Sequence, residues 1–230
     1  VEITLTTPTI NLVSTGQLTA APSASGEVVF TLQNPLSGTA LANANVLVSV
    51  GSGGGQLVGA DASGNLSLTT DVDGQIRFNY TQSAQGGVTG ELLVQIGNSP
   101  GQTITVSSIA PKINIAGPGA NDSEATSHFA VTLVDATDES QALTNAPIVV
   151  RLVSGQGSLT GNGPLSLMTD NAGQVAFAFE HPVDAGTAQI EVASGETTET
   201  VSITTEADLN FTLAVMSPSQ RVVVEQPVLA

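Results

Sequence analysis

Apolar and polar side chains alternate along many short segments of the chain. Residues 75–80 read Gln-Ile-Arg-Phe-Asn-Tyr, residues 174–179 read Gln-Val-Ala-Phe-Ala-Phe, and the alternation recurs in residues 46–50, 92–96 and 190–192. Successive side chains of a β-strand point to opposite faces, so a period of two predicts strands with one buried face. Val and Thr, which suit half-buried pleated surfaces, are abundant. We therefore predict an all-β chain.

Turn residues separate the predicted strands at intervals of roughly 8–12 residues, which is typical of sandwiches and barrels rather than of βαβ units. Gly accepts a positive φ and so marks the places where strands reverse. Such turns stand at residues 51–55, 73–74, 85–87, 172–173 and 194–195. No segment shows the sustained apolar spacing of three and four that predicts an amphipathic helix.

The chain repeats itself. Residues 70–80 and 169–179 both read Thr-Asp-x-x-Gly-Gln-(Ile/Val)-x-Phe-x-(Tyr/Phe). Two further blocks precede this motif in the same order, with residues 43–48 matching 145–150 and residues 55–59 matching 157–161. Blocks that recur in one order predict two copies of one structural unit.

These matches divide the chain into two units of about 100 residues, the size of an immunoglobulin-like β-sandwich. We expect the first unit at residues 8–109 and the second at residues 110–205, arranged end to end. Residues 1–7 are expected to be the end strand of a preceding unit or an N-terminal extension. Residues 206–230 are too few for another core, because about 40 residues is a practical minimum. They are expected to be the start of a following unit or a docked C-terminal tail.

The repeated motif resembles a known family. The segment Thr-Asp-x-x-Gly-Gln-hydrophobic-x-Phe follows Asn-Ala-x-(Val/Ile)-x-Val and a Gly-rich turn before Leu57 or Leu159, as in bacterial immunoglobulin-like repeats of the invasin and intimin type. The resemblance covers both units, residues 8–205. It implies an extracellular stalk module in tandem array on the surface of a Gram-negative bacterium, whose partners are neighbouring immunoglobulin-like domains and a surface or host protein.

Composition favours a folded chain and excludes several partners. Apolar residues make up 40% of the chain and charged residues 10%, whereas disordered chains are usually poor in the first and rich in the second. Four basic residues against 20 acidic ones give a net charge of −16, which excludes nucleic acid and anionic membrane surfaces as partners. No run approaches the ~20 apolar residues of a membrane-spanning helix, so we expect no direct membrane insertion. The absence of Cys excludes disulfides, Cys-ligated zinc and iron–sulfur clusters.

The repeated motif contains a candidate calcium loop that we interpret as a turn. Residues 71–74 read Asp-Val-Asp-Gly, like the opening of an EF-hand loop, but the third acid and the closing Glu are missing. The second copy keeps Asp170 and Gly173 and replaces the middle acid with Ala. A turn tolerates that change, because Asp71 or Asp170 caps the reversal while Gly74 or Gly173 takes the positive φ.

Acidic residues elsewhere in the second unit are candidate ligands for calcium. Asp135, Asp138 and Glu139 cluster in one predicted loop, and Asp122 and Glu124 stand nearer the start of the unit. Hard cations bind such oxygen clusters. The alternative interpretation is a solvated acidic loop. We expect no other cofactor.

Catalytic motifs are missing from the sequence. No G-x-S-x-G elbow, H-E-x-x-H motif or P-loop is present. His128 and His181 have no His or Cys companion nearby, so we expect structural or exposed histidines. Aromatic residues are 3% of the chain, and Tyr80 falls on an inward-facing set, which disfavours a sugar site built by stacking. We predict that the chain is not an enzyme.

The resulting functional hypothesis is mechanical. Two sandwiches joined by a short linker at residues 108–111 would project a partner domain away from the cell, and Pro111 would make the junction semi-rigid. One alternative is a surface-layer or filament subunit that assembles by strand exchange, with residues 1–7 and 206–230 as donors. Another is a receptor-binding adhesin module, which would need an exposed apolar or aromatic patch.

Overall fold

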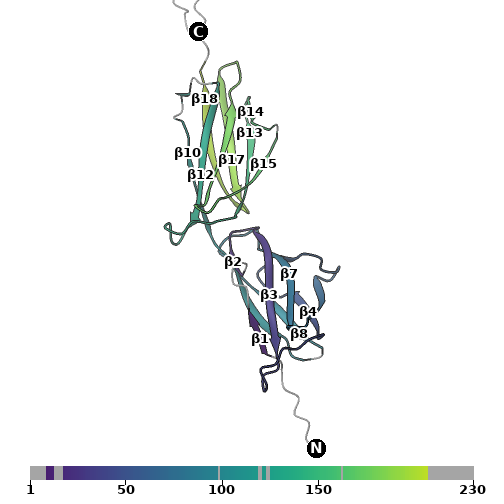
Figure 1. Cartoon of the computed structure of the whole chain (residues 1–230). Helices are drawn as coiled ribbons and strands as arrows, with labels where there is room; N and C mark the ends of the chain where they lie inside the picture. Colours follow the sequence, from purple (N-terminus) through teal and green to yellow (C-terminus); the bar gives the residue numbers. More distant parts are fainter. Residues whose placement is uncertain are drawn as a thin grey trace, which may run out of the picture.

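Two β-sandwiches follow one another along the long axis of the molecule in the computed structural model (Figure 1). Every regular element in the described part of the chain is a β-strand, so the predicted all-β fold is confirmed. Within the same part, no helix is long and apolar enough to cross a membrane. The structure describes residues 9–12, 18–97, 99–118, 121–122, 125–161 and 163–206.

The first sandwich, β1 to β9, pairs a 4-stranded sheet of order β1-β3-β7-β5 with a 5-stranded sheet of order β2-β9-β8-β4-β6. Its strands are β1 (Thr9–Leu12), β2 (Thr19–Ala20), β3 (Ser25–Gln33), β4 (Asn45–Val50), β5 (Gln56–Leu57), β6 (Asn65–Thr69), β7 (Gln75–Thr81), β8 (Thr89–Ile96) and β9 (Gln102–Ser108).

The second sandwich, β10 to β18, repeats this topology, with sheets of order β10-β12-β16-β14 and β11-β18-β17-β13-β15. Its strands are β10 (Pro111–Ala116), β11 (Asn121–Asp122), β12 (Thr126–Asp135), β13 (Pro147–Ser154), β14 (Ser158–Leu159), β15 (Leu165–Met168), β16 (Gln174–Glu180), β17 (Gly186–Ser194) and β18 (Thr197–Thr205). Each described strand of one sandwich therefore has its counterpart in the other, as the duplicated sequence predicted.

The first two strands of each sandwich belong to different sheets. β1 pairs antiparallel with β3, whereas β2 pairs parallel with β9. In the same way β10 pairs antiparallel with β12, and β11 pairs parallel with β18. An N-terminal segment that contributes to both sheets, with an aliphatic core packed between those sheets, is typical of the immunoglobulin-like fold.

The cores contain the side chains that the alternation predicted. Ile76, Phe78 and Tyr80 on β7 are buried, while Arg77 and Asn79 between them are exposed. Both sheets contribute to each core. The buried cores include the aromatic pairs Phe30–Phe78, with ring centroids 5.6 Å apart, and Phe129–Phe177, with ring centroids 5.0 Å apart.

Each sandwich has two ends, which we call poles. The lower pole of the first sandwich holds the β3–β4 loop, the β6–β7 turn and the β8–β9 hairpin, and its upper pole holds residues 20–24 and the β7–β8 loop. The corresponding connections form the poles of the second sandwich. The upper pole of the first sandwich meets the lower pole of the second (Figure 1).

Candidate functional site

The junction between the sandwiches is the first candidate site, because the proposed mechanical role depends on it. β9 ends at Ser108 and β10 begins at Pro111, so only Ile109 and Ala110 connect the two. Ile109 N donates to Ala20 O (2.9 Å), and Ala110 O accepts from Ala136 N (2.9 Å). Pro111 has a fixed φ and keeps Ala110 extended. The connection is therefore short and is hydrogen-bonded to both sandwiches.

A hairpin of the second sandwich also contacts the first. The β17–β18 turn consists of Gly195 and Glu196, and Glu196 N donates to Ala84 O (2.9 Å). Gly195 has φ 59°, and a Cβ there would overlap Ala84 O and lie 2.6 Å from Pro22 Cβ. Only glycine lets the hairpin approach the first sandwich this closely.

A second close approach involves Gly86 in the β7–β8 loop. A Cβ on Gly86 would lie 2.5 Å from Pro111 Cδ and 3.1 Å from Ile109 O. The two sandwiches also border a groove of about 320 Å³. The groove is lined by Thr19, Ala20, Ala21, Ala24, Ser25, Ile109, Gln141, Ala142, Leu143, Thr144 and Asn145.

The repeated Thr-Asp-x-x-Gly motif forms a hydrogen-bonded turn at each lower pole. Asp71 Oδ1 accepts from the backbone N–H groups of Asp73 (2.9 Å) and Gln75 (2.8 Å). Gly74 has φ 71°, and its carbonyl accepts from Leu32 N (2.8 Å). A Cβ on Gly74 would lie 2.7 Å from Leu32 O, so the turn requires glycine.

The second copy of the turn has the same geometry. Asp170 Oδ1 accepts from Ala172 N (2.8 Å) and Gln174 N (2.8 Å), and Gly173 has φ 70°. Leu133 N donates to Gly173 O (2.8 Å). Because Ala172 replaces the second acid of the first copy while the geometry persists, the turn does not depend on a cation ligand at that position.

The Thr that opens the motif ties the turn to the preceding loop. Thr70 Oγ1 donates to Leu41 O (2.5 Å) and accepts from Ala44 N (2.8 Å). Thr169 Oγ1 does the same with Leu143 O (2.6 Å) and Ala146 N (2.9 Å). The Asn-Ala block and the Thr-Asp block, which recur together in the sequence, are therefore halves of one hydrogen-bonded unit.

The acidic loop at the lower pole of the second sandwich uses its carboxylates locally. Asp135 Oδ1 accepts from the backbone N–H (2.7 Å) and the hydroxyl (2.7 Å) of Thr137, which lower the pKa of Asp135 in that order. Asp138 Oδ1 accepts from the N–H (3.2 Å) and hydroxyl (2.6 Å) of Ser140. Glu139 forms an ion pair with Lys112 (2.5 Å).

The predicted calcium ligands fall at two separate ends of the second sandwich. Asp122 lies on β11, which pairs with the last residues of β18, whereas Asp135 lies opposite Pro111 at the junction. The side chain of Asp122 and all of Glu124 are outside the described residues. Among the residues that are described, no group of three or more His, Cys, Asp or Glu is placed to hold a metal ion. Calcium binding stays a prediction.

Sequence reasoning missed a polar network at the upper pole of the second sandwich. His181 Nε2 lies 2.6 Å from Ser127 Oγ, and His181 Nδ1 lies 2.7 Å from Thr205 Oγ1. The ring also packs edge-on against Phe179, with centroids 5.2 Å apart. Since Ser127 is only 1% exposed, its hydroxyl does not face a substrate, and the network fastens β12 to β18 instead. No sequence signal connects these three residues, which are far apart along the chain.

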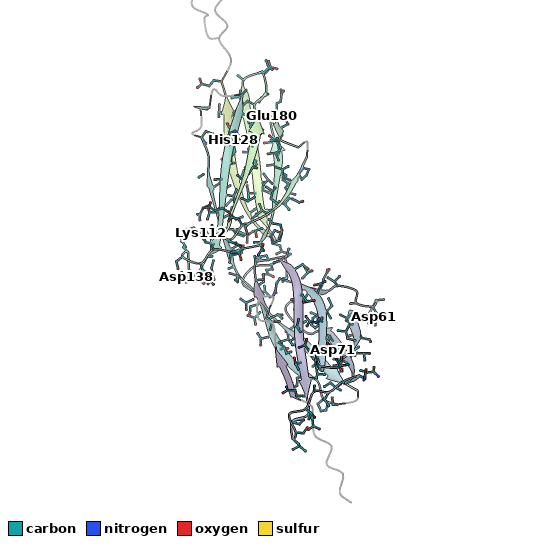
Figure 2. All side chains as sticks on the ribbon, in the orientation of Figure 1. Asp61, Asp71, Lys112, His128, Asp138 and Glu180 are labelled. Atoms are coloured by element: carbon teal, nitrogen blue, oxygen red, sulfur yellow. The ribbon has the colours of Figure 1, made fainter. Side chains whose placement is uncertain are left out.

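Figure 2 shows where the labelled polar residues lie. Lys112 and Asp138 are near the junction, whereas His128 and Glu180 are toward the other end of the second sandwich (Figure 2). His128 is exposed on β12, one of the two environments expected for the histidines. The predicted strand donors, residues 1–7 and 206–230, lie outside the described residues apart from Glu206.

No protein-family model matches the sequence, and no curated protein matches it. Solved structures do match. The adhesin InvE of Yersinia pseudotuberculosis is 15% identical with a TM-score of 0.41, and the match covers 86% of this chain and 59% of InvE. The D0–D1 domain of intimin is 14% identical with a TM-score of 0.36, covering 86% of this chain and 95% of that one. Domains 5–6 of the S-layer protein SbsC are 16% identical with a TM-score of 0.33, covering 88% and 98%.

The structural neighbours of this chain therefore include immunoglobulin-like domains of bacterial adhesins of the invasin and intimin type, together with S-layer domains. The chain spans 59% of the length of the InvE structure. The immunoglobulin-like fold itself rests on the strand pairing described above.

Proposed function

We propose that this chain is a non-enzymatic spacer segment of a bacterial cell-surface adhesin, which acts outside the cell and holds a partner domain away from the surface. The observation that carries the proposal is the junction, where a connection of only two residues, Ile109 and Ala110, is hydrogen-bonded to both sandwiches. A spacer must transmit position from one end to the other, and a short, supported connection does so.

Further contacts join the two sandwiches outside the connection itself. The hairpin at Gly195 and Glu196 reaches Ala84, and Gly86 packs close to Pro111. These contacts resist bending, because a hinge motion at the connection would have to break them together with the hydrogen bonds of Ile109 and Ala110. This arrangement supports a semi-rigid rod.

The surface chemistry and the sequence motif support the same role. The net charge of −16 keeps neighbouring rods apart, and added salt weakens that repulsion. The repeated Thr-Asp-x-x-Gly motif resembles the repeats of invasin and intimin, which supports a place in a tandem array on a bacterial surface. The partners proposed are neighbouring immunoglobulin-like domains, and a surface or host protein.

A distance measurement across the whole molecule tests the proposal. The chain has no Cys, so Val72→Cys and Val183→Cys would place two fluorophores, one at the lower pole of the first sandwich and one at the upper pole of the second. Both Val side chains are exposed, at 80% and 93%. Strands of nine to ten residues at about 3.3 Å per residue give two sandwiches and their loops a span of ~80 Å.

The expected result is a single narrow distance distribution centred near that span. A second pair, Val72→Cys with Gln85→Cys, spans the first sandwich alone and supplies the width expected for a rigid body. A short mean distance, or a distribution much broader than that of the control pair, would show a folded-back or freely hinged chain and contradict the spacer role.

A further inference from the structure

One turn of the first sandwich belongs to the hydrophobic core of the second. Ala21 (3% exposed) and Ala24 (6% exposed) are part of the buried cluster that contains Phe129, Leu143 and Ile148. Ala20 and Ile109 pack partly buried against the same cluster. The buried cluster of the first sandwich contains neither Ala21 nor Ala24. We call residues 20–24 the docking turn.

The duplicated fold provides an internal control at the lower poles. Leu143 and Leu41 are equivalent, because each donates its N–H across its loop, to Leu133 O and Leu32 O respectively. Leu143 is buried, with 4% of its surface exposed, whereas Leu41 is only partly buried. The two side chains are alike, so the extra burial of Leu143 comes from the docking turn beside it.

A second equivalent pair shows the same difference. Ala146 and Ala44 both donate to the hydroxyl of the motif Thr, and Ala146 is fully buried while Ala44 is only partly buried. The upper poles give the converse comparison. Ala24 O and Ala125 O accept from equivalent donors, Gln82 N and His181 N, yet Ala24 is buried and Ala125 is exposed.

Ser194 is a small residue beside the hairpin that contacts the docking turn. It stands on β17 directly before Gly195, where the first sandwich has Ile96 on β8. Its side chain is fully buried, and its hydroxyl has no hydrogen-bond partner among the described residues. A polar group buried without a partner costs stability. The presence of Ser at position 194 is therefore explained by its small size rather than by a hydrogen bond. In the first sandwich Ile96 packs partly buried against the core, whereas the second sandwich has the smaller Ser at this position, next to the hairpin residue that approaches Pro22.

We infer that the docking turn is an interaction element that completes the core of the second sandwich, so that the second sandwich depends on the first for its stability while the first does not depend on the second. Removal of the turn would expose Leu143 and Ala146 to water, whereas the apolar cluster of the first sandwich is made entirely of its own residues. This dependence is separate from the spacer function, since a rod can be built from units that are each self-sufficient.

Ala24→Asp in the full chain tests the dependence. The carboxylate would lie against the apolar cluster of the second sandwich and would force the turn out of it, because a buried charge without a partner is costly. Hydrogen exchange measured strand by strand should become about tenfold faster or more in β13 and β17, with β4 and β8 unchanged. Ala125→Asp is the matched control, since Ala125 occupies the same position at an upper pole with no sandwich above it in the described structure, and it should leave both sandwiches unchanged.

A second pair of variants keeps the test decisive if Ala24→Asp does not fold. Gly195→Asn adds a Cβ that overlaps Ala84 O, whereas Gly97→Asn adds one at a hairpin position with a similar φ of 55° and nothing within 4 Å. Asn tolerates this backbone region, so both variants carry the same local strain and only the first disturbs the junction. We expect faster exchange in the second sandwich for Gly195→Asn alone.

Two results would overturn the inference. Unchanged exchange in β13 and β17 for both Ala24→Asp and Gly195→Asn would show that the second core is complete without the turn. Equal acceleration in both sandwiches would show a symmetric interface rather than a one-way dependence. Either result leaves the distance measurement of the spacer hypothesis untouched, because that measurement is made on the chain with its junction residues unaltered.

Discussion

The lower poles of the two sandwiches share a turn motif and differ in the residues around it. Pro35 stands in the first sandwich where Ala136 donates its N–H to Ala110 O in the second. The hairpin at the lower pole of the first sandwich runs from Ile96 to Gln102, whereas that of the second has only Gly195 and Glu196 between its strands. Proline has no N–H to donate, so a neighbour cannot bind the lower pole of the first sandwich through the contact that joins the two sandwiches here.

Exposed side chains at the two poles also differ. Leu36 (78% exposed) and Val72 (80% exposed) occupy positions that Thr137 and Asn171 hold in the second sandwich. The motif residues therefore determine the fold of each pole. The residues beside the motif differ between the poles and determine which neighbour can pack against each one. The two lower poles therefore present different surfaces although they share one turn motif.

The largest effect on stability is expected at the turn motif that the two lower poles share. Gly173→Ala and Gly74→Ala should each destabilise their own sandwich by about 4 kcal/mol, because the left-handed backbone disfavours a Cβ and the Cβ would press on a carbonyl 2.6 or 2.7 Å away. Denaturant unfolding combined with strand-resolved hydrogen exchange measures both losses. A clear inequality between the two would show that the motif does not have the same role in both sandwiches.

The next largest effect should separate the poles. Leu143→Ala should cost about 3 kcal/mol, as expected for a fully buried Leu, whereas Leu41→Ala should cost about half as much because water already reaches its side chain. Thermal unfolding of the two variants makes the comparison. Equal losses would mean that the junction adds nothing to the burial of Leu143.

Alkaline pH should act on the first sandwich through Tyr80, which has no counterpart in the second. Burial raises the pKa of Tyr80 above its usual value near 10, and the phenol donates to Gly54 O (3.0 Å), while the second sandwich has Phe179 at this position. Stability from the protonated phenol is complete below pH 10 and is lost as the pH rises through the folded pKa.

Tyr80→Phe should remove this alkaline loss of stability and cost about 1 kcal/mol at neutral pH for the missing hydrogen bond. Tyrosinate absorbance against pH is unambiguous, since Tyr80 is the single Tyr of the chain. A tyrosinate titration curve with the midpoint of an unperturbed tyrosine would contradict the prediction.

The smallest effect is expected at Ser194. Ser194→Ala removes a buried hydroxyl without a described partner, so the melting temperature should stay the same or rise slightly. Ser194→Ile, which restores the residue type of the first sandwich, should instead lower it by overpacking the junction. A marked loss of stability in Ser194→Ala would show that the hydroxyl has a partner after all.

The fold could be predicted from the sequence because strand alternation and turn chemistry are local. Ile76, Phe78 and Tyr80 point inward because successive strand residues must alternate, and Gly74 is required by a backbone angle at one position. The docking turn could not be predicted in this way. Ala21 and Ala24 show no periodicity, and their burial depends on how a second body is placed against them.

The acidic loop shows that one sequence signal can have two interpretations. Asp135 and Asp138 are close in sequence, which suggested a cation site, yet each is followed two residues later by Thr137 or Ser140. That spacing places a hydroxyl and an N–H against the preceding carboxylate, as in an Asx turn. The Ser127–His181–Thr205 network had no comparable signal, because its members come from three strands or strand ends that meet only in the folded chain.

The parallel pairing of β2 with β9, and of β11 with β18, determines how tension would load each sandwich. Two parallel strands at the entry and exit of a domain are pulled in opposite directions along their own axes when the chain is stretched. Their cross-strand hydrogen bonds, such as Ser107 N to Leu18 O (2.6 Å) and Ile109 N to Ala20 O (2.9 Å), then resist together in shear instead of opening one after another. A stretching force on the first sandwich would therefore be resisted at β2, the short strand beside the junction, whose Ala20 also packs against the core of the neighbouring sandwich.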